Sequence, residues 1–151
     1  MSVGLVIVSH SRALADAAVA LARGMLPGRE LTVEVAAGDV EGGLGTDATA
    51  IAEAMTAAER GDGVVVLMDL GSAVLAAETA LELVDDDVRT RVVLSPAPLV
   101  EGLVGAAVTA AAGADRAQVA AEALRGLAPK QAHLSNGPVA DGDQRGPGTS
   151  G

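Results

Sequence analysis

The sequence contains no aromatic residue and no cysteine among its 151 residues. Without Phe, Tyr or Trp, the core has to be built from Val, Leu, Ile, Met and many Ala. Such small side chains imply that the helices approach their neighbours closely. The absence of cysteine excludes disulfides, thiolate nucleophiles and thiolate metal sites. The length is that of one domain with enough chain to bury a core.

Basic residues are also scarce, with 10 Lys and Arg against 20 Asp and Glu, and the net charge is −10. Nucleic acid and anionic membrane surfaces would repel such a chain, so neither is expected as a partner. The longest uncharged apolar stretch, residues 102–114, is too short to span a bilayer. The N-terminus lacks the basic flank and cleavage pattern of a signal peptide. We therefore expect a soluble, cytoplasmic protein.

Apolar runs rich in Val, Ile and Leu alternate with helical patterns along the chain. The runs at 3–9, 31–36, 63–68 and 91–95 predict strands, three of them apolar nearly throughout, as a sheet covered on both faces requires. This order predicts an α/β fold: an open, mostly parallel sheet of four to five strands with helices on both faces.

The helices are predicted from spacing and from capping residues. Leu14, Ala18, Leu21 and Met25 recur at helical spacing before Gly28, and Ile51, Met55 and Ala58 form a second stripe that Thr46 or Asp47 can cap. Ser72 is predicted to cap a third helix that runs to about Val84. A fourth helix begins near Pro98, and Asp115 with Gln118 resembles the capping box of a fifth. The composition changes near Lys130, and residues 129–151 are predicted to be a disordered tail.

His10 follows the first apolar run and lies in the first predicted strand-to-helix turn. Ligands of open α/β sheets bind at the carboxyl ends of the strands, and an imidazole there can serve as nucleophile, base or ligand. A structural histidine is the alternative. The other histidine, His133, lies in the predicted tail, and no metal-ligand spacing appears, so no metal site is expected.

Two further loops are expected beside His10 at this edge. Asp69 ends a strand and could orient the imidazole through one ring nitrogen, or it could be an ordinary turn residue. Ser72 and the amide of Gly71 could hold a phosphoryl group at a helix N-terminus. The glycine-rich loop at 38–47 could present amides to an anion or could be a flexible surface loop. Together with the hydroxyl of Ser11, this loop supplies the remaining candidate phosphate-binding residues, Gly43, Gly45 and Thr46.

Several classes of enzyme are disfavoured by what is missing. A serine hydrolase would need a Gly-x-Ser-x-Gly elbow, and a dinucleotide or Walker site would need its own glycine fingerprint. A receiver domain would need an acidic cluster after its first strand. The residues that remain favour a histidine that accepts a phosphoryl group transiently. A plain nucleotide-binding α/β domain is a weaker alternative.

Five segments also resemble the DhaM family, the phosphotransferase subunits of phosphoenolpyruvate-dependent dihydroxyacetone kinases, which are related to mannose-type enzyme IIA domains. These segments are LVIVSHS at 5–11, GTDA at 45–48, MDLGSA at 68–73, AETALEL at 77–83 and APLVEG at 97–102. The resemblance covers residues 1–128 and implies a mannose-type IIA-like fold and a homodimer. The segment from Glu41 to Leu44 differs from the family pattern.

The resemblance implies that His10 takes a phosphoryl group from the phosphocarrier protein HPr and passes it to ADP held on DhaL, without a cofactor in this chain. DhaL would then support phosphorylation of dihydroxyacetone by DhaK, and Asp69 would orient His10. Some family members continue into HPr-like and enzyme I-like domains. This chain ends in a short tail, so its donor is expected to be a separate protein. A phosphorylation-dependent regulatory module that controls a partner protein is the alternative function.

Overall fold

The computed structural model describes residues 2–135. A sheet of four parallel strands forms its centre, in the order β2-β1-β3-β4. The strands are β1 (Gly4–Ser9), β2 (Val33–Ala37), β3 (Val64–Met68) and β4 (Val92–Leu94). The predicted α/β fold and its four parallel strands are therefore confirmed.

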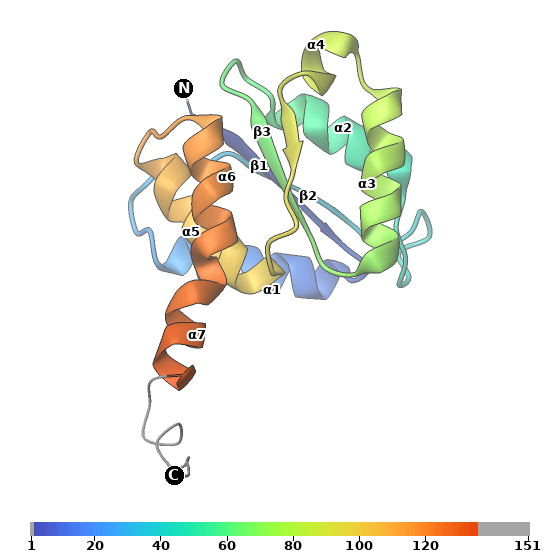
Figure 1. The fold of residues 1–151 in the computed structure, drawn as a ribbon. Coiled ribbons are helices and arrows are strands. Elements are labelled where there is room, and N and C mark those ends of the chain that lie inside the picture. Colours follow the sequence, from blue (N-terminus) through green and yellow to red (C-terminus); the bar gives the residue numbers. More distant parts are fainter. Residues whose placement is uncertain (1, 136–151) are drawn as a thin grey trace.

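Helices cover both faces of this sheet, as Figure 1 shows. On one face lie α1 (Arg12–Gly24), α5 (Leu99–Ala111) and α6 (Arg116–Leu124), and on the other lie α2 (Ala48–Ala58) and α3 (Gly71–Leu83). Alternate residues of each strand face opposite layers: Leu5 and Ile7 of β1 pack toward α1 and α5, whereas Val6 and Val8 pack toward α2 and α3. Because both faces are covered, β1 and β3 are buried along their whole length.

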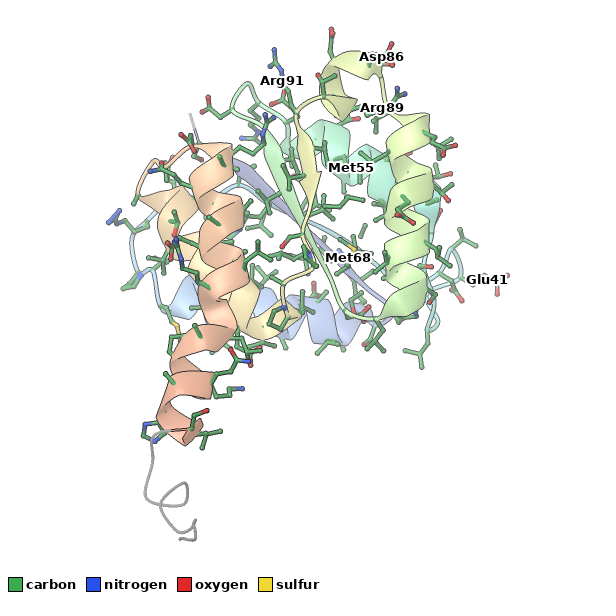
Figure 2. The ribbon with its side chains drawn as sticks, viewed as in Figure 1. Glu41, Met55, Met68, Asp86, Arg89 and Arg91 are labelled. Carbon is green, nitrogen blue, oxygen red and sulfur yellow. The ribbon has the colours of Figure 1, made fainter. Side chains whose placement is uncertain are left out.

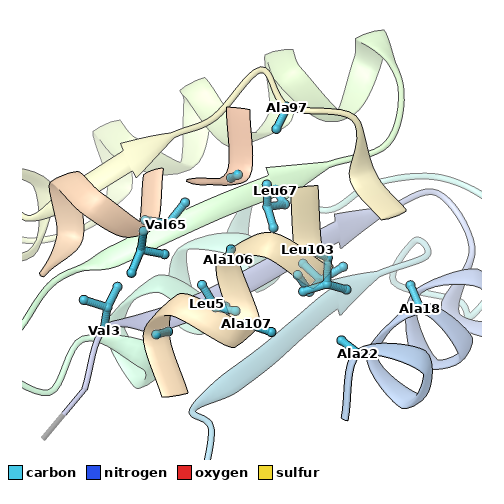
Figure 3. Packing of buried hydrophobic residues seen from close by; sticks show 14 of the residues in the cluster. Val3, Leu5, Ala18, Ala22, Val65, Leu67, Ala97, Leu103, Ala106 and Ala107 are labelled. Atoms are coloured by element: carbon cyan, nitrogen blue, oxygen red, sulfur yellow. The ribbon is translucent and has the colours of Figure 1, made fainter. Parts of the chain in front are cut away.

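The helices bring mostly alanine to the core, as a chain without aromatic side chains requires. Figure 3 shows the cluster under α1 and α5, where Ala18, Ala22, Ala106 and Ala107 meet larger strand residues such as Leu67. Helices α5 and α6 also approach closely at Gly105, where an added Cβ would lie 2.9 Å from the carbonyl oxygen of Glu122. Small residues thus compensate for the missing volume by letting the backbones draw together.

The first predicted helix exists, but the core contacts a different face of it. Ala15, Ala18 and Ala22 are buried. Of the four residues that predicted the helix, Ala18 is buried, whereas Leu14, Leu21 and Met25 are 44%, 47% and 54% exposed. In the second helix the predicted stripe is the buried one, with Ile51, Met55 and Ala58 at most 1% exposed.

The helix starts expected from the sequence are confirmed at Asp47 and Asp115. Asp47 is the N-cap of α2, and Asp115 forms a complete capping box with Gln118 at the start of α6. Helix α5 begins at Leu99, directly after Pro98. Three short helical elements carry no clear sequence signal: α4 (Asp86–Arg89), the 3-10 turn η1 (Arg125–Leu127) and α7 (Ala128–Ser135).

Helix α7 differs from the expectation for the tail. Residues 129–135, predicted to be disordered, belong to this helix, which extends away from the sheet in Figure 1. The Nζ atom of Lys130 lies 2.5 Å from Oε2 of Glu101 on α5, and this ion pair ties α7 to the domain. The rest of the predicted tail lies outside the described residues.

Two methionines fill the space between the sheet and the helices that cover it. Figure 2 shows Met55 and Met68 between the sheet and its covering helices, and both belong to the core cluster beneath α2 and α3.

Near α4, Arg89 donates hydrogen bonds to the carbonyl oxygens of Leu81 (2.8 Å) and Val84 (3.3 Å), which satisfies carbonyl groups at the C-terminal end of α3. In the same view Glu41 projects from the loop before α2.

Candidate active site

The four loops that follow the strands meet at one edge, because all four strands run parallel. His10 follows β1, the glycine-rich loop follows β2, and Asp69 follows β3. The amide of Asp69 donates to the carbonyl oxygen of Val8 (3.1 Å), and the amide of Gly45 donates to that of His10 (3.0 Å). Backbone hydrogen bonds therefore hold three loops around His10 before any side chain is considered.

The imidazole of His10 is hydrogen-bonded at both ring nitrogens. Its Nδ1 lies 2.9 Å from Oδ1 of Asp69, and its Nε2 contacts the hydroxyl of Ser72. An ionised carboxylate only accepts, so in the neutral ring Nδ1 carries the proton and Nε2 keeps a lone pair, to which the Ser72 hydroxyl can donate. The side chain of His10 is 26% exposed and that of Asp69 only 8%. The available lone pair is thus the one on the solvent side, which is what a nucleophile requires.

Asp69 holds its position through four hydrogen bonds. Its Oδ1 accepts from Nδ1 of His10 (2.9 Å) and the amide of Leu70 (2.6 Å), and its Oδ2 accepts from the Ser9 hydroxyl (2.9 Å) and the amide of His10 (3.0 Å). Burial raises the pKa of Asp69, but these four donors outweigh it and hold the pKa below its ordinary value. The carboxylate is therefore ionised at neutral pH and fixes the tautomer of His10.

Ser72 does not have the capping role predicted from the sequence. Helix α3 begins at Gly71, and Leu70 occupies the N-cap position with no side-chain cap. Ser72 is the second residue of the helix, so its hydroxyl is free to contact His10. The amides of the first helical turn have no partner within a helix and carry partial positive charge. Ser72 thus places its hydroxyl beside Nε2, and Gly71 and Ser72 contribute the first two amides of the helix.

The glycine-rich loop is closed by its own aspartate rather than left open as an anion cradle. Oδ1 of Asp39 accepts from the amides of Glu41 (2.9 Å) and Gly43 (2.8 Å). The amide of Gly45 is bonded to the carbonyl of His10. Since glycine can hold a phosphate only through its amide, we do not carry Gly43 and Gly45 into the proposed phosphate site. Their observed role is to shape the loop and attach it to His10.

Ser11 and Thr46 are the other two predicted phosphate-binding residues. Ser11 is the N-cap of α1, and its Oγ accepts from the amide of Leu14 at 3.2 Å. The cap uses only the oxygen, so the hydroxyl proton of Ser11 stays free to donate. Thr46 follows Gly45 and precedes the N-cap Asp47, half-buried beside the His10 turn. A phosphate contact from either residue stays a prediction.

Ser9 is a site residue that the sequence analysis did not select. It ends β1, is fully buried, and donates to Oδ2 of Asp69. A hydroxyl buried without a partner is costly, so a serine that ends an otherwise apolar strand indicates a nearby acceptor. That signal stands in the sequence at the residue before His10.

The surface around His10 combines a cleft with exposed apolar side chains. A cleft of about 450 Å³ lies between α3 and the loop after β4, and its lining includes Asp69, Val74, Glu78 and Pro96. At the tips of the neighbouring loops, Val40, Leu44 and Leu70 are 80%, 79% and 67% exposed. We call these three residues the apolar rim.

Comparison with known proteins places this geometry in a family. The family model described as the fructose IIA component of the phosphotransferase system (PTS), EIIA-man, matches residues 4–120. The chain belongs to this family.

Among EIIA-man relatives, the chain is similar to DhaM phosphoryl donor subunits of phosphoenolpyruvate-dependent dihydroxyacetone kinases. It is 49% identical to that of Pantoea ananatis over 91% of this chain, and 45% identical to that of Escherichia coli over 87%. It spans only 30% and 28% of the length of these two proteins. The DhaM subunit of phosphoenolpyruvate-dependent dihydroxyacetone kinase 2 from Listeria innocua is 35% identical over 70% of this chain and 84% of its own length. The resemblance inferred from the motifs is confirmed.

Solved structures give the same fold. A crystal structure of a protein of unknown function, EF1359, superposes with a TM-score of 0.75 at 33% identity, and the match covers 83% of this chain and 95% of that one. A sigma-54 interaction domain protein from Enterococcus faecalis has a TM-score of 0.61 at 14% identity over 90% of this chain and 98% of its own, which shows a shared fold alone.

Two features are absent from residues 2–135. In this part of the chain, no three His, Cys, Asp or Glu side chains gather as ligands for a metal ion. The same residues include no helix with the length and apolar character needed to cross a bilayer.

Proposed function

We propose that this protein is a phosphohistidine carrier: Nε2 of His10 takes a phosphoryl group from the phosphorylated histidine of an HPr-like protein and passes it to ADP bound on a DhaL-like subunit. A DhaK-like subunit would then phosphorylate dihydroxyacetone. The observation that carries the proposal is the pairing of Nδ1 with Asp69, which leaves the Nε2 lone pair beside Ser72 at a helix N-terminus. The kinase context is supported by the DhaM relatives.

The hydrogen bonds of His10 suit both the uptake and the release of the phosphoryl group. Nε2 attacks the phosphorus, the P–N bond to the donor histidine breaks, and the donor leaves as neutral imidazole. His10 then carries the phosphoryl group on Nε2 while Nδ1 keeps its proton, so no proton has to move. In the second step an oxygen of the ADP β-phosphate attacks, the P–Nε2 bond breaks, and the ring returns to its neutral form.

Each neighbour of the ring has a separate task in this scheme. Asp69, held ionised by its four donors, balances the positive charge that the ring acquires. Ser72 donates to Nε2 in the resting state, so its hydroxyl has to turn toward a phosphoryl oxygen when the ring attacks. The first amides of α3 can stabilise the equatorial oxygens, since phosphoryl transfer depends mainly on positioning and electrostatics.

The surroundings of His10 suit delivery by a protein. Two proteins have to reach Nε2 in turn, and the ring is accessible at an edge bordered by the apolar rim. Exposed apolar side chains of this size beside a reactive group suit a transient protein contact. The acidic surface would suit a donor with a basic face. A homodimer remains a prediction from the family resemblance, and a cytoplasmic location remains a prediction from the sequence.

The direct test is labelling with radioactive phosphoenolpyruvate, enzyme I and HPr. Wild-type protein should acquire an acid-labile, base-stable label, and His10→Ala should acquire none. His133→Ala is the matched control, because His133 is the only other histidine and lies on α7, away from the site. Label that persists in His10→Ala would refute the proposal.

Reconstitution tests the role in the kinase. With DhaK, DhaL, ADP and dihydroxyacetone, dihydroxyacetone phosphate should form only when phosphorylatable protein is added. If His10 is labelled but no triose phosphate forms, the regulatory alternative replaces the kinase role.

A further inference from the structure

Ser9 forms a link between Asp69 and the start of α1. Its hydroxyl donates to Oδ2 of Asp69 at 2.9 Å, and its Oγ accepts from the amide of Ser11 at 3.0 Å. Ser11 is the N-cap of α1, so the hydrogen-bonded chain runs from that helix through Ser9 to the carboxylate. The Ser9 hydroxyl can donate one hydrogen bond, and the carboxylate of Asp69 accepts it.

The backbone leaves Ser9 little freedom to move away from this position. Ser9 is the last residue of β1 and pairs with Ala37 of β2, and its carbonyl oxygen accepts from the amide of Gly38 at 3.1 Å. The residue is fully buried, so its hydroxyl is shielded from bulk solvent. A donor fixed in this way defines where Oδ2 of Asp69 has to lie.

The orientation of Asp69 in turn decides the state of His10. Its two oxygens divide the donors, with Ser9 and the His10 amide on Oδ2 and the His10 ring and the Leu70 amide on Oδ1. We propose that Ser9 is a positioning residue for phosphoryl transfer: it fixes the rotation of the Asp69 carboxylate so that Oδ1 meets Nδ1 of His10 and Nε2 keeps its lone pair. This inference rests on the proposed function and adds a residue to it.

The chain offers a matched control in Ser95. Ser95 directly follows β4, is 2% exposed, and its Oγ accepts from the amide of Ala97 at 3.1 Å. Ser9 likewise ends a strand and accepts from an amide two residues later. The difference is that Ser9 also donates to Asp69. Replacing each serine with alanine therefore removes the same local turn contact, and only Ser9→Ala removes the contact to the carboxylate.

The first measurement is the ¹⁵N NMR spectrum of the His10 ring in unphosphorylated protein, which reports which nitrogen carries the proton. Wild type and Ser95→Ala should show the Nδ1–H form, whereas Ser9→Ala should show a clear fraction of the Nε2–H form. This spectrum needs no donor protein, so it tests Ser9 even if HPr fails to phosphorylate His10, which would count against the proposed function alone.

The second measurement is the rate of phosphorylation by phospho-HPr. Ser9→Ala should lower it about tenfold, equivalent to about 1.4 kcal/mol in the barrier, and Ser95→Ala should leave it within about twofold of wild type. Should Ser9→Ala fail to fold, Ser9→Cys keeps the packing but supplies only a weak donor, and it should show the same direction of change. A wild-type ring spectrum and a wild-type rate in the folded Ser9 variant would overturn the proposal.

Discussion

Replacing Asp69 with asparagine is the most informative perturbation of the site, because it changes the charge and the hydrogen-bonding pattern while keeping the shape. The carboxylate accepts four hydrogen bonds and its side chain is 8% exposed. An asparagine has one acceptor oxygen and one amino group. Two of the four groups that donate to the carboxylate must therefore face the amino group, which is itself a donor.

The introduced side-chain amide can take two orientations, and these have different costs. With its oxygen toward the ring, the tautomer of His10 survives, but the backbone amide of His10 loses its acceptor. With its amino group toward the ring, Nδ1 has to accept, the proton moves to Nε2, and no lone pair is left for attack. Hydrogen bonds to charged groups contribute about 1.5–3 kcal/mol each. We therefore expect the free energy of unfolding to fall by about 1.5–6 kcal/mol, the loss of one to two such bonds.

The same change should also slow transfer. In serine proteases the equivalent substitution costs about 10⁴ in rate because it leaves the histidine, which must act as a base there, in the wrong tautomer. Here His10 needs only its lone pair, so we expect a loss of about 10²-fold, equivalent to about 2.7 kcal/mol. Quenched-flow labelling with phospho-HPr measures the rate, urea unfolding measures the stability, and ¹⁵N NMR measures the tautomer.

Asp47→Asn is the control, because it removes one negative charge at the same edge of the sheet. Asp47 is the N-cap of α2, and asparagine caps helices about as well as aspartate. It should transfer at nearly the wild-type rate. A folded Asp69→Asn protein with a wild-type rate would contradict the role assigned to the carboxylate.

Two further predictions concern acid stability and partner docking. Burial raises the pKa of Glu59, but hydrogen bonds from Gly61 and Gly63 and the charge of Arg91 lower it more, and the pKa of Asp69 is lowered likewise. The stabilisation from each carboxylate is fully present above its pKa in the unfolded chain, which is about 4. It is lost as the pH falls through the lower pKa of the folded state, so the free energy of unfolding should decrease on acidification below about pH 5. Urea titrations at several pH values should show a shallower decrease in Glu59→Gln, and an identical slope would exclude this contribution. On the apolar rim, Leu44→Asp should change stability by no more than about 0.5 kcal/mol yet raise the KM for phospho-HPr several-fold. Leu83→Asp, at a residue that is 56% exposed at the end of α3, should not raise the KM, and equal KM values for the two variants would argue against docking at the rim.

The sequence alone determined the layered fold and the place of the chemistry. Apolar runs such as 3–9 and 63–68 are long enough and β-branched enough to be buried strands, and parallel strands bring their following loops to one edge. His10 and Asp69 both follow such runs, so their meeting could be predicted without coordinates. The caps at Asp47 and Asp115 were also predictable, because capping depends on residues that are close in sequence.

The tertiary structure decided what depends on the direction of side chains and on competition between partners. Leu14, Leu21 and Met25 have the spacing of a buried stripe, yet Ala15, Ala18 and Ala22 face the core because the helix lies close to the sheet.

Within the site, Ser72 follows a strand and a glycine, and from the sequence alone such a serine is expected to be an ordinary helix N-cap. Only the observed start of α3 leaves the Ser72 hydroxyl for His10. In the same way, Asp39 takes the amide of Gly43 that a phosphate would have needed, and Ser9 reaches Asp69 across 60 residues of chain. Such choices depend on distances between segments remote in sequence, and local patterns carry no information about those distances.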